Sequence, residues 1–447
     1  MKSIIRLFFS IIFISISAVV LGQDKPPETP LIIQQKESAD QAREKVYEEF
    51  EEFVRVLKEV QDKYVDEIKL DTILTNAYRG MLSGLDPYSQ YFSPEELEDL
   101  KVETEGEFEG LGIEVIVKEG LLTVITPIVD SPAFKAGILV GDRIIKIDGD
   151  STENMSIREA IKKLRGKIGT KITLTVVHEG DINPVDITIE RAKIHVNSIR
   201  GARMVDSEYK IWYLAVTNFQ ENTVKDMDDA LQTMMKKGMQ GLILDLRFNP
   251  GGLLNVAVEM VDKFLDKGVI VSTKGRDKTQ NYVYQAHKKG TYPNFPIAVL
   301  VNNGSASASE IVAGALKDHR RGLLVGVRTF GKGSVQSLIP VEDGKAALKL
   351  TTARYYTPRG ICIHEKGIEP DIKVPLTLTE TKALHEHMSA ANIDTKPGEP
   401  RDKDKEAVLK GTIPQEKEKQ AYVDVQLERA KDVLKGIEVY AKKRPAP

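Results

Sequence analysis

The stretch Asn302–Gln336 reads NNGSASASEIVAGALKDHRRGLLVGVRTFGKGSVQ and decides the fold class. An apolar run of the strand type, Ile297–Val301, precedes it, and a turn of small residues leads into a helical pattern that begins near Ser309. A second apolar strand follows at Leu323–Val327. Strands that alternate with helices in this way are typical of layered α/β domains.

The same alternation extends toward the N-terminal side. The pattern predicts a strand at Lys210–Val216, a helix at Thr223–Lys236, a strand at Gly241–Leu246 and a helix at Leu253–Leu265. We therefore expect a mixed α/β core over residues 196–375.

Small residues surround the serines at the strand-to-helix turn Gly304–Glu310. Such a turn lets a substrate backbone approach, and it places a hydroxyl beside the unpaired N–H groups of a helix N-terminus. Those groups can hold the negative charge that develops on an attacked carbonyl oxygen. Because serine is also a preferred N-cap residue, the turn alone fits a purely structural cap equally well.

A lysine between two glycines, Gly331-Lys332-Gly333, follows the next strand and so returns to the same edge of the sheet. A serine nucleophile needs a base, and His319, beside Asp318 in a basic helix end, forms no Ser-His-Asp pattern. Burial can lower the pKa of a lysine enough to leave a neutral amine. The GxxxxGK match that ends at Lys332 is not a phosphate-binding loop, because Gly333 stands where Ser or Thr should hold magnesium.

Short strands and turns replace this pattern between Gly106 and Ile194. The order GLGI at 110–113, SPA at 131–133 and GDRIIKIDG at 141–149 closely resembles a PDZ domain, which we predict for residues 106–195. The resemblance implies that the loop Gly110, Leu111, Gly112 and Ile113 offers backbone N–H groups to a chain-terminal carboxylate, while the bound peptide adds a strand to the sheet.

The N-terminus is the one strongly hydrophobic segment. Lys2 and Arg6 are followed by an apolar run at Leu7–Leu21, which suits a signal peptide over residues 1–22 and is short for a membrane span. An uncleaved anchor remains the alternative. Both predict export, to the periplasm or the outer face of the cytoplasmic membrane.

Composition excludes several classes of function. Among 447 residues, 63 basic and 66 acidic side chains give a net charge of −3, which provides no long-range attraction to nucleic acid. The single cysteine, Cys362, cannot form an internal disulfide, and no Cys/His cluster has zinc-ligand spacing. We expect neither metal nor cofactor.

Helical and polar segments flank the predicted domains. Residues 23–105 are predicted to be a tether followed by a helical region, and residues 376–447 a polar linker with a helix at Gln426–Tyr440. Helical patterns at both ends fit either a bundle that packs on its own chain or a dimerisation arm. The sequence therefore leaves open whether the protein forms a homo-oligomer.

The chain as a whole resembles the carboxyl-terminal processing (tail-specific) proteases, serine endopeptidases that use a Ser/Lys pair. The resemblance covers roughly residues 45–375 and rests on SASASE and FGKGxVQ in the quoted stretch, on the PDZ segment, and on further motifs at 85–89, 245–252, 355–358 and 367–371. Tyr88 stands where the family usually has His, outside the implied catalytic set.

The resemblance implies particular roles. Ser307 is the nucleophile, Lys332 the general base and Gln336 the residue that supports the lysine. The oxyanion donors are the N–H of Ala308 and the Gly251-Gly252 loop, which also suits a tight strand-to-helix turn.

Two further positions receive no firm role. Asp318 matches a position that some members need. Arg165 could couple the PDZ domain to the site, although it more simply ends a helix.

These features predict an exported serine endopeptidase that recognises protein C-termini through its PDZ domain. The alternative is a PDZ scaffold, which binds peptides and carries an inactive protease core. It is disfavoured because Ser307, Lys332 and Gln336 are all present.

Overall fold

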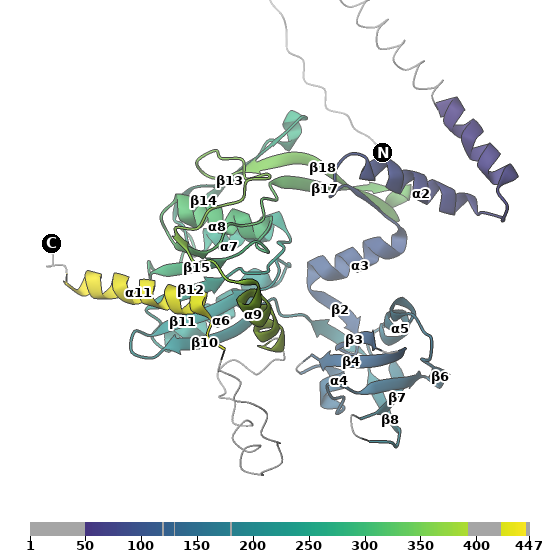
Figure 1. Cartoon of the computed structure of the whole chain (residues 1–447), viewed down its shortest axis with the longest axis horizontal. Coiled ribbons are helices and arrows are strands. Elements are labelled where there is room, and N and C mark those ends of the chain that lie inside the picture. Colours follow the sequence, from purple (N-terminus) through teal and green to yellow (C-terminus); the bar gives the residue numbers. More distant parts are fainter. Residues whose placement is uncertain (1–49, 119, 129, 179–180, 392–421, 444–447) are drawn as a thin grey trace, which may run out of the picture. The chain divides into compact units, whose positions relative to one another are not determined.

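The computed structural model describes residues 50–118, 120–128, 130–178, 181–391 and 422–443. The predicted signal peptide or anchor, the tether and most of the polar linker lie outside these residues. The chain forms two compact units, one up to Ala77 and one from Tyr78 (Figure 1). In the first, residues 50–63 are helical, and α2 (Leu70–Ser83) begins there. No helix among the described residues is both long and apolar enough to cross a bilayer.

A six-stranded sheet forms the α/β core of the second unit. Its strand order is β10-β11-β12-β15-β16-β19, with β10 antiparallel to β11 and the remaining pairs parallel. The strands are β10 (Ile199–Asp206), β11 (Ile211–Val216), β12 (Gly241–Asp245), β15 (Ile297–Val301), β16 (Leu323–Gly326) and β19 (Ile372–Lys373). The predicted α/β class is confirmed.

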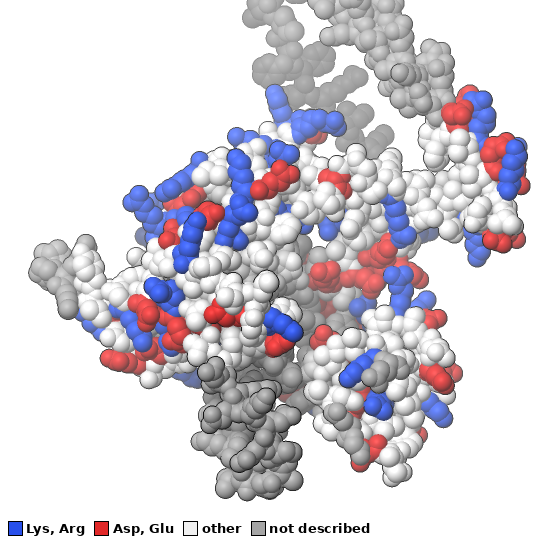
Figure 2. Space-filling model, in the orientation of Figure 1, with Lys and Arg blue, Asp and Glu red and all other residues white. Residues whose placement is uncertain are grey.

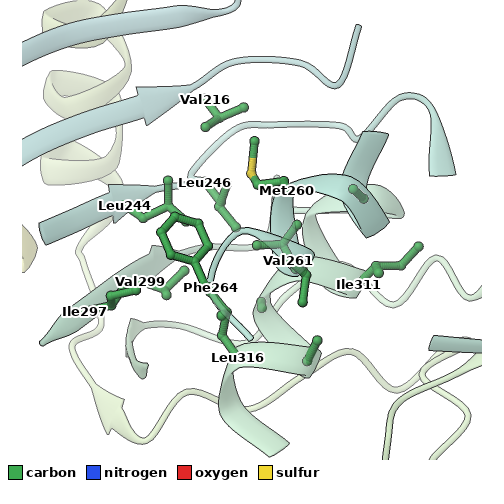
Figure 3. Packing of buried hydrophobic residues seen from close by; sticks show 14 of the residues in the cluster. Val216, Leu244, Leu246, Met260, Val261, Phe264, Ile297, Val299, Ile311 and Leu316 are labelled. Carbon is green, nitrogen blue, oxygen red and sulfur yellow. The ribbon is translucent and has the colours of Figure 1, made fainter. Parts of the chain in front are cut away.

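Helices cover both faces of this sheet, as parallel sheets require. Successive residues of β12 point to opposite faces, so Leu242 and Leu244 pack in one cluster and Ile243 in another. The first cluster is closed by α6 (Thr223–Lys236), α7 (Leu254–Asp262) and α8 (Ala308–Asp318), and the second by α11 (Val425–Lys443). Figure 3 shows the first cluster, where Phe264 lies among side chains of the sheet and the helices.

A second, antiparallel sheet adjoins the core. It has the order β1-β18-β13-β14, and β17 pairs along the other edge of β18. The strands are β1 (Gln90–Phe92), β13 (Lys267–Gly275), β14 (Val283–His287), β17 (Ser334–Val341) and β18 (Ala346–Tyr356), with short 3-10 turns η1 (Lys278–Gln280) and η2 (Glu342–Gly344). The α/β alternation gave no sign of this sheet.

The predicted PDZ segment forms its own sheet and its own core. The strand order is β3-β4-β5-β7-β8, with β6 paired to β5, which leaves β3 as an edge. The elements are β3 (Ile113–Lys118), β4 (Leu121–Pro127), α4 (Pro132–Lys135), β5 (Arg143–Ile147), β6 (Asp150–Ser151), α5 (Ile157–Leu164), β7 (Lys171–Val177) and β8 (Val185–Glu190).

Shorter elements border the PDZ segment and the core. The strands β2 (Glu107–Gly110) and β9 (Ala192–His195) pair with each other at the two ends of the PDZ segment. Helix α3 (Pro94–Glu105) precedes β2, and it begins with a capping box formed by Ser93 and Glu96, with Pro94 in the first turn. Helix α9 (Leu378–Ala391) follows β19.

Candidate active site

The three loops that follow β12, β15 and β16 build the site at the carboxyl ends of parallel strands. Ser307 lies at the turn between β15 and α8, with φ 55° and ψ −113°. This left-handed φ is strained for a residue with a side chain and costs on the order of 1–3 kcal/mol. Such strain is characteristic of functional turns, where the surrounding structure over-determines the backbone.

The neighbouring serines are structural. Ser305 is fully buried, and its hydroxyl donates to the Leu246 carbonyl at 2.8 Å. Ser309 is also fully buried and donates to the Asn249 carbonyl at 2.9 Å. Both hydroxyls tie the serine turn to the loop after β12. The middle serine, Ser307, is only partly buried and makes no such tie.

Glu310 binds the serine turn to the lysine loop. This carboxylate, 0% exposed, accepts the N–H of Ser307 at 2.9 Å and the N–H of Lys332 at 2.8 Å. It also accepts the Gly331 N–H at 2.8 Å and the Thr329 hydroxyl at 2.6 Å. Burial raises the pKa of Glu310, and these hydrogen bonds oppose that rise. In the sequence, the only local sign of this role is the place of Glu310 three residues after Ser307, which has capping-box spacing.

The amine of Lys332 lies over an aromatic ring. Its Nζ is 4.7 Å from the ring centroid of Tyr88, and within the described chain it makes no hydrogen bond or ion pair. Burial lowers the pKa of Lys332, the nearby charge of Lys349 lowers it further, and the charge of Glu310 opposes the shift. A lowered pKa is what a lysine base requires.

Tyr355 of β18 contacts both candidate catalytic residues. Its hydroxyl donates to the main-chain carbonyl of Lys332, and the Ser307 side chain acts to lower the pKa of its phenol. The residue is 2% exposed, and burial raises the pKa of its phenol well above the ordinary value. In the sequence, Tyr355 stands out only as part of the motif at 355–358, because nothing local indicates that it reaches the serine turn.

The Gly251-Gly252 loop lies against the nucleophile. A Cβ atom on Gly251 would come within 2.8 Å of the Ser307 Cβ and 3.0 Å of the Ala308 nitrogen, so only glycine fits there. The N–H of Gly251 already donates to Asn249 Oδ1 at 2.9 Å. Among the described residues, the N–H groups of Gly252 and Ala308 have no acceptor, which leaves them available to a developing oxyanion.

Gln336 lies on β17, four residues beyond Lys332. Its Nε2 donates to Ser334 Oγ at 2.9 Å and Thr351 Oγ1 at 3.3 Å. Within the described residues no hydrogen bond joins it to Lys332. The described contacts therefore tie Gln336 to Ser334 of its own strand and to Thr351 of β18, whereas Glu310 links the loops that carry Ser307 and Lys332.

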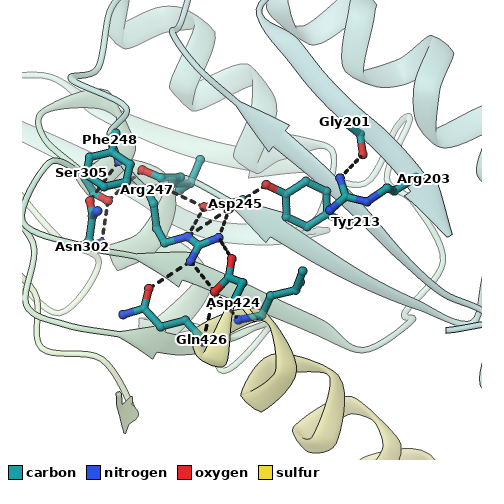
Figure 4. Close-up of polar contacts among 12 residues, drawn as sticks. Gly201, Arg203, Tyr213, Asp245, Arg247, Phe248, Asn302, Ser305, Asp424 and Gln426 are labelled. Carbon is teal, nitrogen blue, oxygen red and sulfur yellow. Dashed lines mark hydrogen bonds and ion pairs between the residues drawn. The ribbon is translucent and has the colours of Figure 1, made fainter. Parts of the chain in front are cut away.

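A buried polar network stabilises the loop that follows β12 (Figure 4). Arg247 is paired with Asp245 at 2.7 Å and with Asp424, just before α11, also at 2.7 Å. Asn302 Oδ1 accepts the Phe248 N–H at 2.9 Å. These contacts fix the segment that leads into the glycine loop.

The predicted peptide-binding loop of the PDZ segment joins β2 to β3. The carbonyls of Leu111 and Gly112 accept hydrogen bonds from Ala133 at 3.0 Å and Ile128 at 2.8 Å. In the described part of the chain the N–H groups of Leu111 and Gly112 have no acceptor. Gly112, with φ +77°, packs too closely on Ser131 to carry a side chain.

The two residues without a firm role have structural contacts. Asp318 Oδ2 accepts the Arg359 N–H at 3.0 Å, which fixes the loop after β18. Arg165 ends α5 and pairs with Asp99 of α3 at 3.0 Å.

The fold and the matched domains define a protease that carries a PDZ domain. Residues 210–374 match the model of peptidase family S41, and residues 110–189 match a PDZ domain.

A carboxy-terminal-processing protease of Bartonella bacilliformis is 43% identical over 78% of this chain and 80% of that protein. A carboxy-terminal processing protease of Bacillus subtilis is 35% identical over 84% of this chain and 78% of its own length. The chain therefore belongs to the carboxy-terminal processing proteases. Among solved structures, the photosystem II D1 C-terminal processing protease is 30% identical, covers 72% of this chain and 92% of its own, and superimposes with a TM-score of 0.41.

Proposed function

We propose that this protein is an exported serine endopeptidase that captures protein C-termini in its PDZ domain and cleaves peptide bonds through a Ser/Lys acyl-enzyme. One observation carries the proposal: a single buried carboxylate, Glu310, accepts the main-chain N–H of both Ser307 and Lys332. Two loops that are separate in sequence are thereby held together, which supports the pairing of a nucleophile with a base in one site.

Acylation uses groups that the site provides. Neutral Lys332 takes the proton of the Ser307 hydroxyl as Oγ bonds to the scissile carbonyl carbon, and the carbonyl π pair moves to oxygen. The N–H groups of Ala308 and Gly252 hold that oxyanion. When the intermediate collapses, the C–N bond breaks, and the leaving amine takes the proton from Lys332.

Deacylation repeats these steps with water. Lys332 takes a proton from water as its oxygen attacks the ester carbonyl, and it returns the proton to Ser307 Oγ as the ester bond breaks. Because each half-reaction begins with a neutral amine, activity should rise as the pH increases through the pKa of Lys332, which burial lowers.

The PDZ domain supplies the recognition. The N–H groups of Leu111 and Gly112, which have no acceptor among the described residues, suit a terminal carboxylate, and β3 is an edge to which an extended peptide can add. The charged N-terminal residues and apolar run support export, so the expected substrates are envelope or secreted proteins.

Cleavage of two model proteins tests the proposal, one with an apolar C-terminal tail and one with the tail amidated. The wild-type protein should cleave the first much faster. Ser307→Ala and Lys332→Ala should each lose cleavage, by a factor of at least ~10³, while retaining binding of the tailed peptide. Activity in either purified variant would refute the Ser/Lys assignment, and tail binding without turnover by the wild type would favour the scaffold alternative.

A further inference from the structure

The turn Leu85–Ser89 holds Tyr88 in a fixed position beside the lysine loop. The Asp86 carboxylate accepts the N–H of Tyr88 at 2.8 Å and the N–H and hydroxyl of Ser89 at 2.9 and 2.8 Å. Ser89 is 3% exposed, and its Oγ accepts the Thr351 N–H of β18 at 3.1 Å. The turn is therefore attached to the same strand that carries Tyr355.

This anchoring presents the face of the Tyr88 ring to Lys332. The Nζ lies 4.7 Å from the ring centroid, well inside the ~6 Å over which a ring quadrupole attracts a cation. Among the described residues, the charged groups that act on this amine are Lys349 on β18 and Glu310 on α8, and the Tyr355 hydroxyl of β18 lies at the main-chain carbonyl of Lys332. Lys349 opposes a second positive charge, and Glu310 has its oxygens occupied by four donors.

The amine thus lacks a carboxylate partner in direct contact among the described residues. It must nevertheless become an ammonium each time it accepts a proton from Ser307 or water. An aromatic face can stabilise that ammonium without taking a proton itself. A carboxylate in the same place would hold the lysine permanently charged and unable to act as a base.

We propose that Tyr88 is a positioning residue for the reaction, whose ring face holds the Lys332 amine and stabilises the ammonium formed during proton transfer. This inference rests on the proposed Ser/Lys mechanism. It also gives a role to the one motif position where this chain departs from the pattern of its family, and which the resemblance left outside the catalytic set.

Two substitutions distinguish an effect of the aromatic ring face on the Lys332 amine from an effect of apolar burial alone. Tyr88→Phe keeps the ring, and Tyr88→Leu keeps an apolar side chain without a quadrupole. The measurement is kcat/KM against pH for full-length protein and a fluorogenic peptide with a free C-terminus. Tyr88→Phe should reproduce the acidic limb of the wild type. Tyr88→Leu should move it about one pH unit lower, a tenfold change in the protonation equilibrium.

Either of two results would overturn the inference: an acidic limb of Tyr88→Leu that coincides with the wild type or moves higher, or a Tyr88→Phe profile that shifts as far as that of Tyr88→Leu. Tyr88→Met, also apolar and unbranched at Cβ, serves in place of Leu if that variant melts early. Lys332→Ala in the same assay separates the two proposals. If the Lys332→Ala variant is active, the Ser/Lys mechanism is wrong. If Lys332→Ala is inactive and the acidic limb of Tyr88→Leu coincides with that of the wild type, only the role of Tyr88 is wrong.

Discussion

Glu310 decides whether Ser307 and Lys332 belong to one rigid site. A carboxylate has acceptor sites for all four of its donors, whereas an amide of the same shape presents an NH₂ group to some of them. A buried donor left without an acceptor costs about 1–3 kcal/mol. Because the backbone of Ser307 is strained, the loss of a hydrogen bond to Glu310 should change the conformation of the serine turn.

Glu310→Gln should therefore reduce kcat far more than it changes KM. We expect a fall in kcat of about 10–100-fold, with a lower melting temperature, because the reacting groups are misaligned while the PDZ domain still binds the substrate. Steady-state kinetics on a tailed peptide and differential scanning calorimetry would measure both effects. The control is Glu369→Gln, whose exposed ion pair with Lys373 contributes little. Equal kinetics in the two variants would contradict this positioning role.

The sequence indicated the candidate catalytic residues better than the residues that hold them. Ser307 and Lys332 lie in small-residue turns that have a local signature. Tyr355 and Tyr88 act through contacts made across the fold, by strands whose pairing no local pattern specifies. Choosing Ser307 among its neighbours required the family resemblance, and the structure adds a physical reason, since Ser305 and Ser309 are both buried and hydrogen-bonded.

At the scale of elements, strong periodicity was a reliable guide. The helix predicted at Thr223–Lys236 has those bounds in α6, because its apolar residues recur every three or four positions and all face the sheet. The antiparallel sheet around β18 was missed. Its register joins segments far apart in the chain, as in the pairing of β1 with β18, and half-buried strands leave only a weak pattern.

Helix α11 is attached to the core by a buried ion pair. Arg247 is 3% exposed and makes two bonds to Asp424, at 3.0 and 2.7 Å, next to the start of the helix. Burial alone would raise the pKa of Asp424, but the hydrogen bonds and charge of Arg247 outweigh it, so its pKa lies below the ordinary 3.8. A carboxylate with a depressed pKa stabilises the fold above pH 3.8, and this contribution is lost as the pH falls through the folded-state value.

Asp424→Asn should lower the free energy of unfolding at pH 7 by on the order of 3 kcal/mol, because it leaves a buried guanidinium without full compensation. The difference from the wild type should shrink as the pH falls below 3.8 and through the lowered pKa of Asp424, because the carboxyl is then protonated in the wild type as well. Urea unfolding followed by circular dichroism at several pH values measures this. Asp432→Asn, an exposed change on the same helix, should have little effect. A constant difference at all pH values would show that the ion pair is not its source.

The molecule as a whole has mixed surface charge and separate hydrophobic cores. Basic and acidic side chains both lie on the face shown in Figure 2, and neither kind covers it continuously. This agrees with the net charge of −3 and with recognition of backbone and chain ends rather than of a strongly charged partner. The PDZ core and the cluster under α6, α7 and α8 share no residue.

Separate cores predict separate unfolding transitions. Leu174 of β7 and Leu244 of β12 are both fully buried, one in each core, so each Leu→Ala change should remove about 2–5 kcal/mol from its own domain. In calorimetry, Leu174→Ala should lower one transition and Leu244→Ala the other. A peptide with a free C-terminal carboxylate should raise only the transition that Leu174→Ala lowers, since a ligand stabilises the domain that binds it, and the amidated peptide is the control. A single transition that both substitutions lower equally would mean that the domains unfold as one unit, and the PDZ domain would then be an integral part of the protease core.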